Sequence, residues 1–393
     1  MTVMGRAIRE LTARNRRALV LAVLTGCCTL GLGLAMPDGL KFAAGRSAAR
    51  APLARGVRFI GSVDTMKLSR DRAGNLGAVE IHRVVDLLGK SLNTTHVTDD
   101  ADLEQPSVIE AWANRIHADG KRVWFRPNSA TCSQAHGDLG DGYPSYRPGY
   151  LTKLHDVMRA HPGFFISGDI LDGDPEVENS CWWAQHYGCG LQTHCRPCNR
   201  FASNLPCAPI RQFNAFLAKM TAQENRDLAA MGIVGVSTNV HSTDPGTAMT
   251  ILTPGLVRSM GNLVTIDAYP DQNTTEPAAA ASAWRDELAR WHRSWLRRGL
   301  NVSILIGEWG YSNAINVDDA TQRAVIEAEV SRAFKGVPYL VGTNYWVGPG
   351  TVGDGGHTEI LRPNPAGVWQ LRPAAAVISR FYAGMNEPRP PRH

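Results

Sequence analysis

The most informative segment of this 393-residue chain reads Val302-Ser303-Ile304-Leu305-Ile306-Gly307-Glu308-Trp309-Gly310-Tyr311. It begins with a short apolar run that does not alternate with polar residues, as in a parallel strand buried on both faces. Glu308 follows directly, between two glycines. A carboxylate there loses hydration unless a partner or a reacting group stabilises its charge, and glycine lets backbone or substrate approach closely. Glu308 is therefore the leading catalytic candidate, and a structural, salt-bridged glutamate is the alternative.

Similar short apolar runs recur along the chain and alternate with helical patterns. The predicted strands are Arg58–Val63, Thr94–Thr98, Arg122–Arg126, Gly163–Ser167, Ile233–Thr238, Leu263–Asp267, Val302–Gly307 and Tyr339–Tyr345. Trp284, Trp291 and Trp295 repeat at helical spacing, so we expect them to pack in the core. Strands alternating with helices over residues 56–385 predict an α/β fold, a single (β/α)8 TIM barrel. The alternative, an open doubly wound sheet, would carry a glycine-rich phosphate loop that this sequence lacks.

The positive charge of the chain is concentrated at its N-terminus. Residues 1–55 carry a net charge of +7, against +5 for the whole chain, so the remainder is weakly acidic. A weakly acidic globular part has no electrostatic footprint for nucleic acid. We therefore expect no nucleic-acid partner, and we attribute the basic residues to targeting.

The first 36 residues have the layout of an export signal or a membrane anchor. A basic stretch precedes the apolar run Ala18 to Leu24 and then Thr25-Gly26-Cys27. Leu24 to Cys27 resembles the bacterial lipobox, which implies lipidation of Cys27 and a cell-surface lipoprotein. An uncleaved anchor from Ala18 to about Met36 and free secretion remain open. Residues 37–55 are expected to be a linker and 386–393 a tail.

Six cysteines remain beyond Cys27 and Cys28: Cys132, Cys181, Cys189, Cys195, Cys198 and Cys207. An even number in an exported protein predicts three disulfides, and the sequence does not select their pairing. Most of these cysteines would staple an insert after the fourth strand. A zinc site that includes His194 is the alternative, but its spacing is poor, so we expect no metal.

Polar and aromatic residues stand where nearly every predicted strand ends. They are Asp64, Lys67, His96, Asp99, Arg126, Asn128, Asp169 through Glu178, Asn239, His241, Asp267, Tyr269, Glu308, Trp309, Asn344 and Trp346. In a barrel, these strand ends carry the chemistry. Of this set we expect Arg126, Asn239, Tyr269, Trp309 and Trp346 to bind substrate, with a Tyr269 hydroxyl or Arg126 keeping Glu308 ionised.

Ile306 to Gly310 resembles the nucleophile strand of the retaining (β/α)8 glycoside hydrolases, often called clan A. The resemblance implies that Glu308 is the nucleophile and that an acid/base glutamate follows the fourth strand. Glu176 matches best by position, although Pro175 and Val177 replace the usual Asn and Pro. Glu178 and Asp169 remain alternatives.

Two further positions fit the same superfamily. Tyr269 resembles the sixth-strand tyrosine that contacts the nucleophile, and Trp346 resembles the tryptophan beneath the reacting sugar. Trp182, Trp183 and Tyr187, in the cysteine-rich insert, would pack against sugar faces or form the core of that insert.

The prediction is therefore an exported glycosidase that cleaves β-glycosidic bonds with two carboxylates, without a cofactor, on an oligo- or polysaccharide. A non-catalytic carbohydrate-binding envelope protein on a degenerate barrel is the main alternative. A metal-dependent hydrolase is a further one, but it lacks a convincing ligand set on the early strands.

Overall fold

The computed structural model describes residues 59–65, 68, 77–92, 96–99, 106–126, 160, 165–166, 168–171, 234–235, 240–241, 249, 252–271, 274–311, 318–349 and 358–386. The chain divides into two units, Met1–Ser47 and Ala48–His393, and all described residues belong to the second. The predicted signal or anchor, the linker and residues 387–393 lie outside the described residues. Among the residues described, no helix has both the length and the apolar character needed to cross a bilayer.

The described strands form two parallel sheets and one hairpin. The five-stranded sheet has the order β1 (Ile60–Val63), β9 (Leu340–Tyr345), β8 (Ser303–Trp309), β7 (Leu263–Asp267) and β6 (Val240–His241). The four-stranded sheet has the order β2 (His96–Asp99), β3 (Arg122–Phe125), β4 (Ile170–Leu171) and β5 (Val234–Gly235). Every pairing in both sheets is parallel. β10 (Leu361–Pro363) and β11 (Trp369–Leu371) pair antiparallel.

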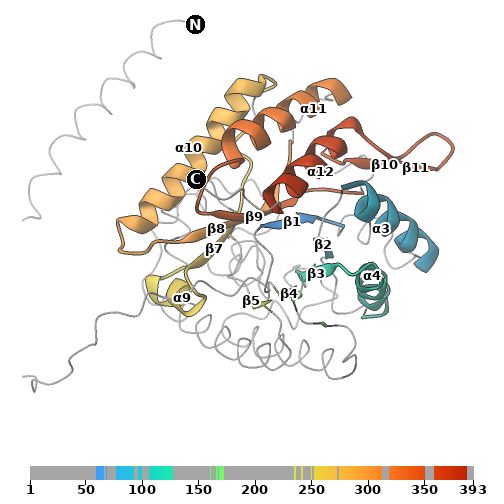
Figure 1. Cartoon of the computed structure of the whole chain (residues 1–393), viewed down its shortest axis with the longest axis horizontal. Coiled ribbons are helices and arrows are strands. Elements are labelled where there is room, and N and C mark those ends of the chain that lie inside the picture. The colour runs from blue at the N-terminus through green and yellow to red at the C-terminus, as the bar shows by residue number, and fades with distance from the viewer. Residues whose placement is uncertain are drawn as a thin grey trace, which may run out of the picture. The chain divides into compact units, whose positions relative to one another are not determined.

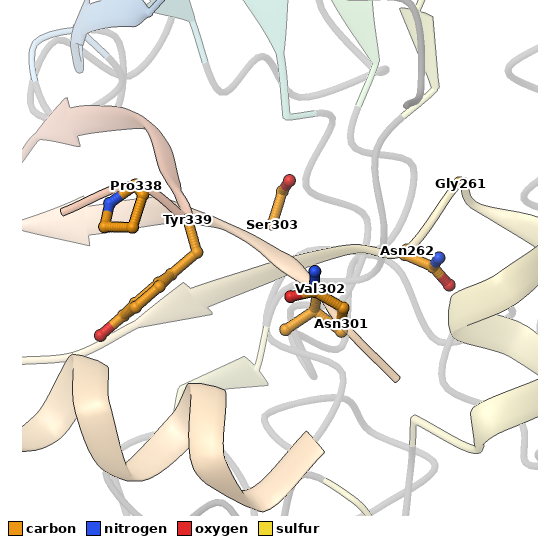
Figure 2. A pocket seen from close by; sticks show the side chains of 7 residues that line it. All are labelled: Gly261, Asn262, Asn301, Val302, Ser303, Pro338 and Tyr339. Atoms are coloured by element: carbon orange, nitrogen blue, oxygen red, sulfur yellow. The ribbon is translucent and has the colours of Figure 1, made fainter. Parts of the chain in front are cut away.

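Helices follow most of these strands and pack around them (Figure 1). They are α3 (Ala78–Leu92), α4 (Pro106–Ala118), α9 (Pro254–Ser259), α10 (Pro277–Leu296), α11 (Asp319–Ala328), the π-helical η4 (Glu329–Phe334) and α12 (Pro373–Asn386). The predicted apolar stripe of α10 is confirmed, because Trp284, Trp291 and Trp295 are all fully buried. Asp318 caps α11 by accepting a hydrogen bond from the Thr321 N–H at 2.7 Å. The described fold is mixed α/β with parallel sheets.

Two apolar cores hold the strands in place. The larger core lies between the strands and the helices and includes the tryptophans of α10. The smaller core is made of one buried side chain from each of six strands, drawn from both sheets: Ile60, Trp124, Ile170, Leu263, Leu305 and Val341. The two sheets therefore share an inner core.

Six of the predicted strands are confirmed within two residues at either end, namely those that became β1, β2, β3, β7, β8 and β9. The fourth prediction, Gly163–Ser167, is wrong as a strand position, because β4 begins at Ile170. Phe165 is buried but packs its ring on Phe125, with centroids 4.6 Å apart. A turn follows, in which Gly168 has a φ of +94° and the Asp169 N–H donates to the Ile166 carbonyl. Phe165 therefore serves tertiary packing, and residues 165–166 do not belong to a strand.

The fifth predicted strand, Ile233–Thr238, contains β5, and β6 begins two residues beyond its end. β5 pairs with β4 in one sheet, and β6 pairs with β7 in the other. Only residues 236–239 separate the two segments, and β5 and β6 are not neighbours in either sheet. A crossover between separate parallel strands takes roughly a dozen residues or more, so this connection is too short for one.

Candidate active site

Glu308 lies near the carboxyl end of β8, where its neighbours in the sheet fix its position. It pairs in register with Asp267 of β7, next to an irregularity in the ladder. The backbone carbonyl of Trp346 passes so close to Gly310 that a Cβ there would lie 2.1 Å from its oxygen. The Trp346 N–H also donates to the Trp309 carbonyl at 2.7 Å. The prediction that a glycine beside Glu308 permits a close backbone approach is confirmed at Gly310.

Arg126 follows β3 and reaches across to the strands of the other sheet. Its Nη1 donates to Glu308 Oε1 at 2.7 Å, and its Nη2 donates to Asp267 Oδ2 at 2.8 Å. Nη1 also lies 3.6 Å from Asp64 Oδ2, just after β1. Because a guanidinium presents several donors in one plane, a single side chain can hold carboxylates from three strands.

Tyr269 supplies the second contact to Glu308. It stands two residues after β7, and its hydroxyl donates to Glu308 Oε2 at 2.9 Å. Both oxygens of Glu308 therefore accept a hydrogen bond, one from a cation and one from a phenol. Two such donors fix the orientation of a carboxyl group. The predicted contacts of Arg126 and Tyr269 with Glu308 are both present.

Asn344, on β9, ties the site to β1 and β8. Its Nδ2 donates to Asp64 Oδ2 at 3.1 Å and to the Gly307 carbonyl at 2.9 Å. Asp64, Asp267 and Asn344 were noted in the sequence as polar residues at strand ends, but no role was predicted for them. A polar residue after a buried strand was the signal, and the sequence did not show which of them share one guanidinium.

Burial distinguishes Glu308 from its acidic neighbours. Arg126 and Asp267 are 1% exposed and Asp64 is 0% exposed, whereas Glu308 is 6% exposed. One guanidinium faces three carboxylates in a setting from which water is nearly excluded. Of the three carboxylates, Glu308 has the greatest access to an incoming molecule.

Asp169 lies at the opposite end of β3 from this site. Its carboxylate accepts hydrogen bonds from the Val123 N–H at 2.9 Å and the Ile166 N–H at 2.8 Å. It also contacts the His117 ring nitrogen at 3.0 Å. Val123 is near the start of β3, while Arg126 follows its end. Asp169 therefore fixes the entry to β4 and is wrong as an acid/base partner of Glu308.

Trp309 is placed away from the site, which corrects its prediction as a substrate-binding residue. It is fully buried, and its ring meets those of Phe334 and Tyr345 edge to face, each at a centroid distance of 5.0 Å. Successive side chains of a strand point to opposite faces. Because Glu308 points toward Arg126, Trp309 points into the outer core.

The remaining predicted residues are described only in part. Trp346 is partly exposed just after β9, and its peptide bond to Val347 is cis. Those that lie outside the described residues are Cys27, Lys67, Asn128, Cys132, Glu176, Glu178, Cys181, Trp182, Trp183, Tyr187, Cys189, Cys195, Cys198, Cys207 and Asn239. In the part of the chain that is described, no group of three or more His, Cys, Asp or Glu side chains could hold a metal ion.

The fold is similar to that of solved glycosidases. The apo structure of a β-glucosidase, 1317, is matched over 78% of this chain and 89% of its own, with 14% identity and a TM-score of 0.51. A β-glucuronidase from Lactobacillus rhamnosus is matched over 78% of this chain and 46% of its own, with 11% identity and a TM-score of 0.51. The chain spans about half the length of the β-glucuronidases it matches. No protein-family model and no curated protein sequence matches the chain.

Proposed function

We propose that this chain is a retaining β-glycoside hydrolase with Glu308 as its nucleophile and Glu176 as its acid/base. The observation that carries the proposal is the pair of hydrogen bonds to Glu308, from Arg126 at 2.7 Å and from Tyr269 at 2.9 Å. They hold the carboxyl group of Glu308 in one orientation, as a nucleophile needs. The similarity to a β-glucosidase and a β-glucuronidase supports a glycosidase-like fold.

The proposal includes a closed (β/α)8 barrel. β5 and β6 would be the two ends of one continuous strand, since they are too close in sequence for a crossover. That strand would join the two sheets on one side, while β1 and β2, which contact each other, would close the other. Counted this way the described strands of the two parallel sheets number eight, and the small shared core is the kind of side-chain layer that fills such a barrel.

The reaction would proceed in two displacements. Glu308 would attack the anomeric carbon while the acid protonates the departing oxygen, giving a glycosyl–enzyme ester that water then hydrolyses. As Glu308 loses its charge in the ester, Arg126 would stay bound to Asp267 and keep its place. The partner acid is expected about 5–5.5 Å from Glu308. Glu176 stands five residues after Leu171, the last residue of β4, and Glu178 stays the alternative.

The charges of the described site favour a neutral sugar over a uronic acid. Arg126 is already shared by Asp64, Asp267 and Glu308. A substrate carboxylate would add a fourth negative charge around one guanidinium, and like charges at short range in a buried site repel strongly. A chromogenic β-glucoside should therefore be hydrolysed faster than the matching β-glucuronide.

The decisive variant is Glu308→Gln, which keeps the shape of the side chain and removes the nucleophile. We expect turnover of a chromogenic β-glycoside to fall by at least about 10³-fold, with an unchanged circular dichroism spectrum. The exposed Glu276→Gln on the same chain serves as the control and should keep full activity. Sugar binding without turnover, unchanged in Glu308→Gln, would favour the non-catalytic carbohydrate-binding protein instead.

The acid/base assignment has its own test. Azide replaces a missing acid/base carboxylate in the second displacement when the substrate has an activated leaving group. We expect azide to restore activity to Glu176→Ala and not to Glu178→Ala. If azide restores activity only to Glu178→Ala, Glu178 is the acid/base and Glu176 is not. If it restores activity to neither variant, neither glutamate is the acid/base.

Export with lipidation of Cys27 is also part of the proposal, on the sequence pattern of residues 1–36. A labelled fatty acid fed to an expressing bacterium should be incorporated into the wild-type chain and not into Cys27→Ser. A labelled Cys27→Ser chain would overturn the lipid site, and wild-type protein that stays in the cytoplasm would overturn export. The three disulfides are proposed on the same basis and are checked by mass mapping of the non-reduced protein.

A further inference from the structure

A second pair of acids lies behind the loop that carries Tyr269. Asp271 stands two residues after Tyr269, and Glu329 is the first residue of η4. Both are buried completely or almost completely, at 1% and 0% exposure. π-helical turns are rare in proteins, and where they occur they often lie at functional sites. The carboxyl groups of Asp271 and Glu329 are close enough to act on each other.

Among the residues described, no hydrogen bond of good geometry satisfies these two groups. All four of their carboxyl oxygens are buried without a geometrically good donor among the residues described. Two ionised carboxylates can only accept hydrogen bonds, so they cannot satisfy each other. If one of them keeps a proton, its O–H donates to the other, and both groups then have a partner. The pair is therefore complete only with one shared proton.

Within the described part of the chain, burial and the mutual effect of the two acids dominate the behaviour of the pair, and no cation acts on it. Burial raises the pKa of Asp271 to about 6, and burial and then the charge of Asp271 raise the pKa of Glu329 well above its ordinary value. The Trp284 indole from α10 acts on Asp271 in the opposite direction, and more weakly. The nearby Tyr345 hydroxyl of β9 is kept neutral, since burial raises its pKa well above the usual value.

Arg372 is the cation among the described groups that act on Tyr345, and it makes its contacts with other acids. Its Nε donates to Asp319 Oδ1 at 2.8 Å, and its Nη1 lies 3.6 Å from Glu359 Oε1. Glu359 acts on Tyr345 in the same direction as the pair itself. No cation is among the described groups that shift Asp271 or Glu329.

We propose that Asp271 and Glu329 are positioning residues whose shared proton holds the β7 loop against η4, and thereby holds Tyr269 on Glu308. The inference rests on the proposed function, because it concerns the residue that would stabilise the nucleophile. At a pH below that at which the pair loses its shared proton, a buried hydrogen bond between the two acids fixes the loop. Above it, two buried negative charges repel and separate the loop from η4. The site is complete at acidic pH and loosens as the pH rises.

The direction for stability follows from proton linkage. The unfolded chain releases these protons near pH 4, whereas the folded pair retains at least one to about pH 6 or higher. The folded state thus binds more protons over that interval, so stability falls as the pH rises through it. The contribution of the pair is present in full below about pH 4 and is lost above the raised pKa values.

The test uses Glu329→Gln, whose amide donates to Asp271 at every pH. Between pH 5 and pH 8 the melting temperature of the wild type should fall by about 4–6 °C, and that of Glu329→Gln by clearly less. Asp271→Asn should have the same effect and serves if Glu329→Gln does not fold. Glu327→Gln, exposed one half-turn earlier, should behave like the wild type. Equal pH dependence in all four proteins would overturn the shared proton.

The link to Tyr269 is read from the pH profile of kcat/KM. In Glu329→Gln the pH at which kcat/KM falls on the alkaline side should be higher than in the wild type by about one pH unit or more. In a Tyr269→Phe background the same substitution should cause no such shift, because the hydroxyl it would position is gone. A shift that persists in Tyr269→Phe would overturn the positioning role. Absence of any glycosidase activity would overturn the proposed function and this role with it, while the melting curves decide the shared proton separately.

Discussion

Arg126 is the residue that connects the largest number of strands at the candidate site. It follows β3 and contacts side chains that follow or lie in β1, β7 and β8. Its burial is tolerable because its charge is balanced at short range by carboxylates. The sequence predicted that Arg126 lies at a strand end and that it contacts Glu308. It could not show that Asp64 and Asp267 share the same guanidinium, since strands that are distant in the chain bring them together.

A substitution at Arg126 separates charge from geometry. In Arg126→Lys the positive charge remains, but a single ammonium cannot make parallel hydrogen bonds to Glu308 and Asp267. We expect a loss of about 3–5 kcal/mol in the free energy of unfolding, measured by denaturant titration, together with reduced turnover. Arg290→Lys, on the exposed side of α10, should stay within about 0.5 kcal/mol of the wild type. Equal stability of the two variants would contradict the bridging role.

At the scale of elements, the strands in the second half of the chain were predicted most accurately. β7 was predicted with its observed bounds, and β8 and β9 within two residues, because each is a continuous apolar run followed by a turn. β4 was misplaced because its apolar signal is only two residues long, while the stronger run before it packs Phe165 on Phe125. That error placed Asp169 after the strand, whereas it precedes the strand and accepts hydrogen bonds from two backbone N–H groups. Local pattern cannot separate a buried strand from a buried turn of similar composition.

The joint between β8 and β9 depends on the absence of a side chain at Gly310. A Cβ there would lie 2.1 Å from the Trp346 carbonyl oxygen, so Gly310→Ala must displace the segment that follows β9. We expect a loss of about 1–3 kcal/mol in stability and a weaker affinity for sugar, if Trp346 lines the substrate site. Thermal unfolding and isothermal calorimetry measure the two effects. Gly336→Ala is a useful comparison, because its positive φ of 85° causes backbone strain without a steric contact.

A wild-type melting temperature and affinity in Gly310→Ala would show that the Trp346 backbone can move away at no cost.

At the scale of the whole described unit, the C-terminal helix completes the environment of the first strand. Gly61 of β1 leaves room for the Tyr382 ring, where a Cβ would lie 2.6 Å from the ring carbon. The Tyr382 hydroxyl donates to the Ser62 carbonyl at 2.8 Å, and the Phe381 ring meets Phe59 edge to face at 5.4 Å. Nothing in the sequence pattern shows that this helix packs next to β1. Such long-range pairing is set by tertiary packing, which periodicity does not encode.

Removing α12 tests how far the rest of the fold depends on this helix. A chain ending at Leu371 lacks α12 and exposes Phe59 and the side of α3 on which α12 packs. We expect it to lose its cooperative thermal transition and to bind a dye specific for exposed apolar surface. A chain ending at Glu387, which keeps all of α12, should melt like the full-length protein. A cooperative transition in the shorter chain would show that the rest of the fold is stable by itself.

The contact between the two ends of the described chain also sets the order in which parts of the fold can form during synthesis. The Phe59 N–H donates to the Asn386 side-chain oxygen at 3.2 Å, across 327 residues. Because a ribosome synthesises the chain from its N-terminus, Phe59 can make this contact only after Asn386 has been added. The packing around the first strand therefore forms late relative to the packing of the segments between these two residues, in which most neighbours are closer along the chain.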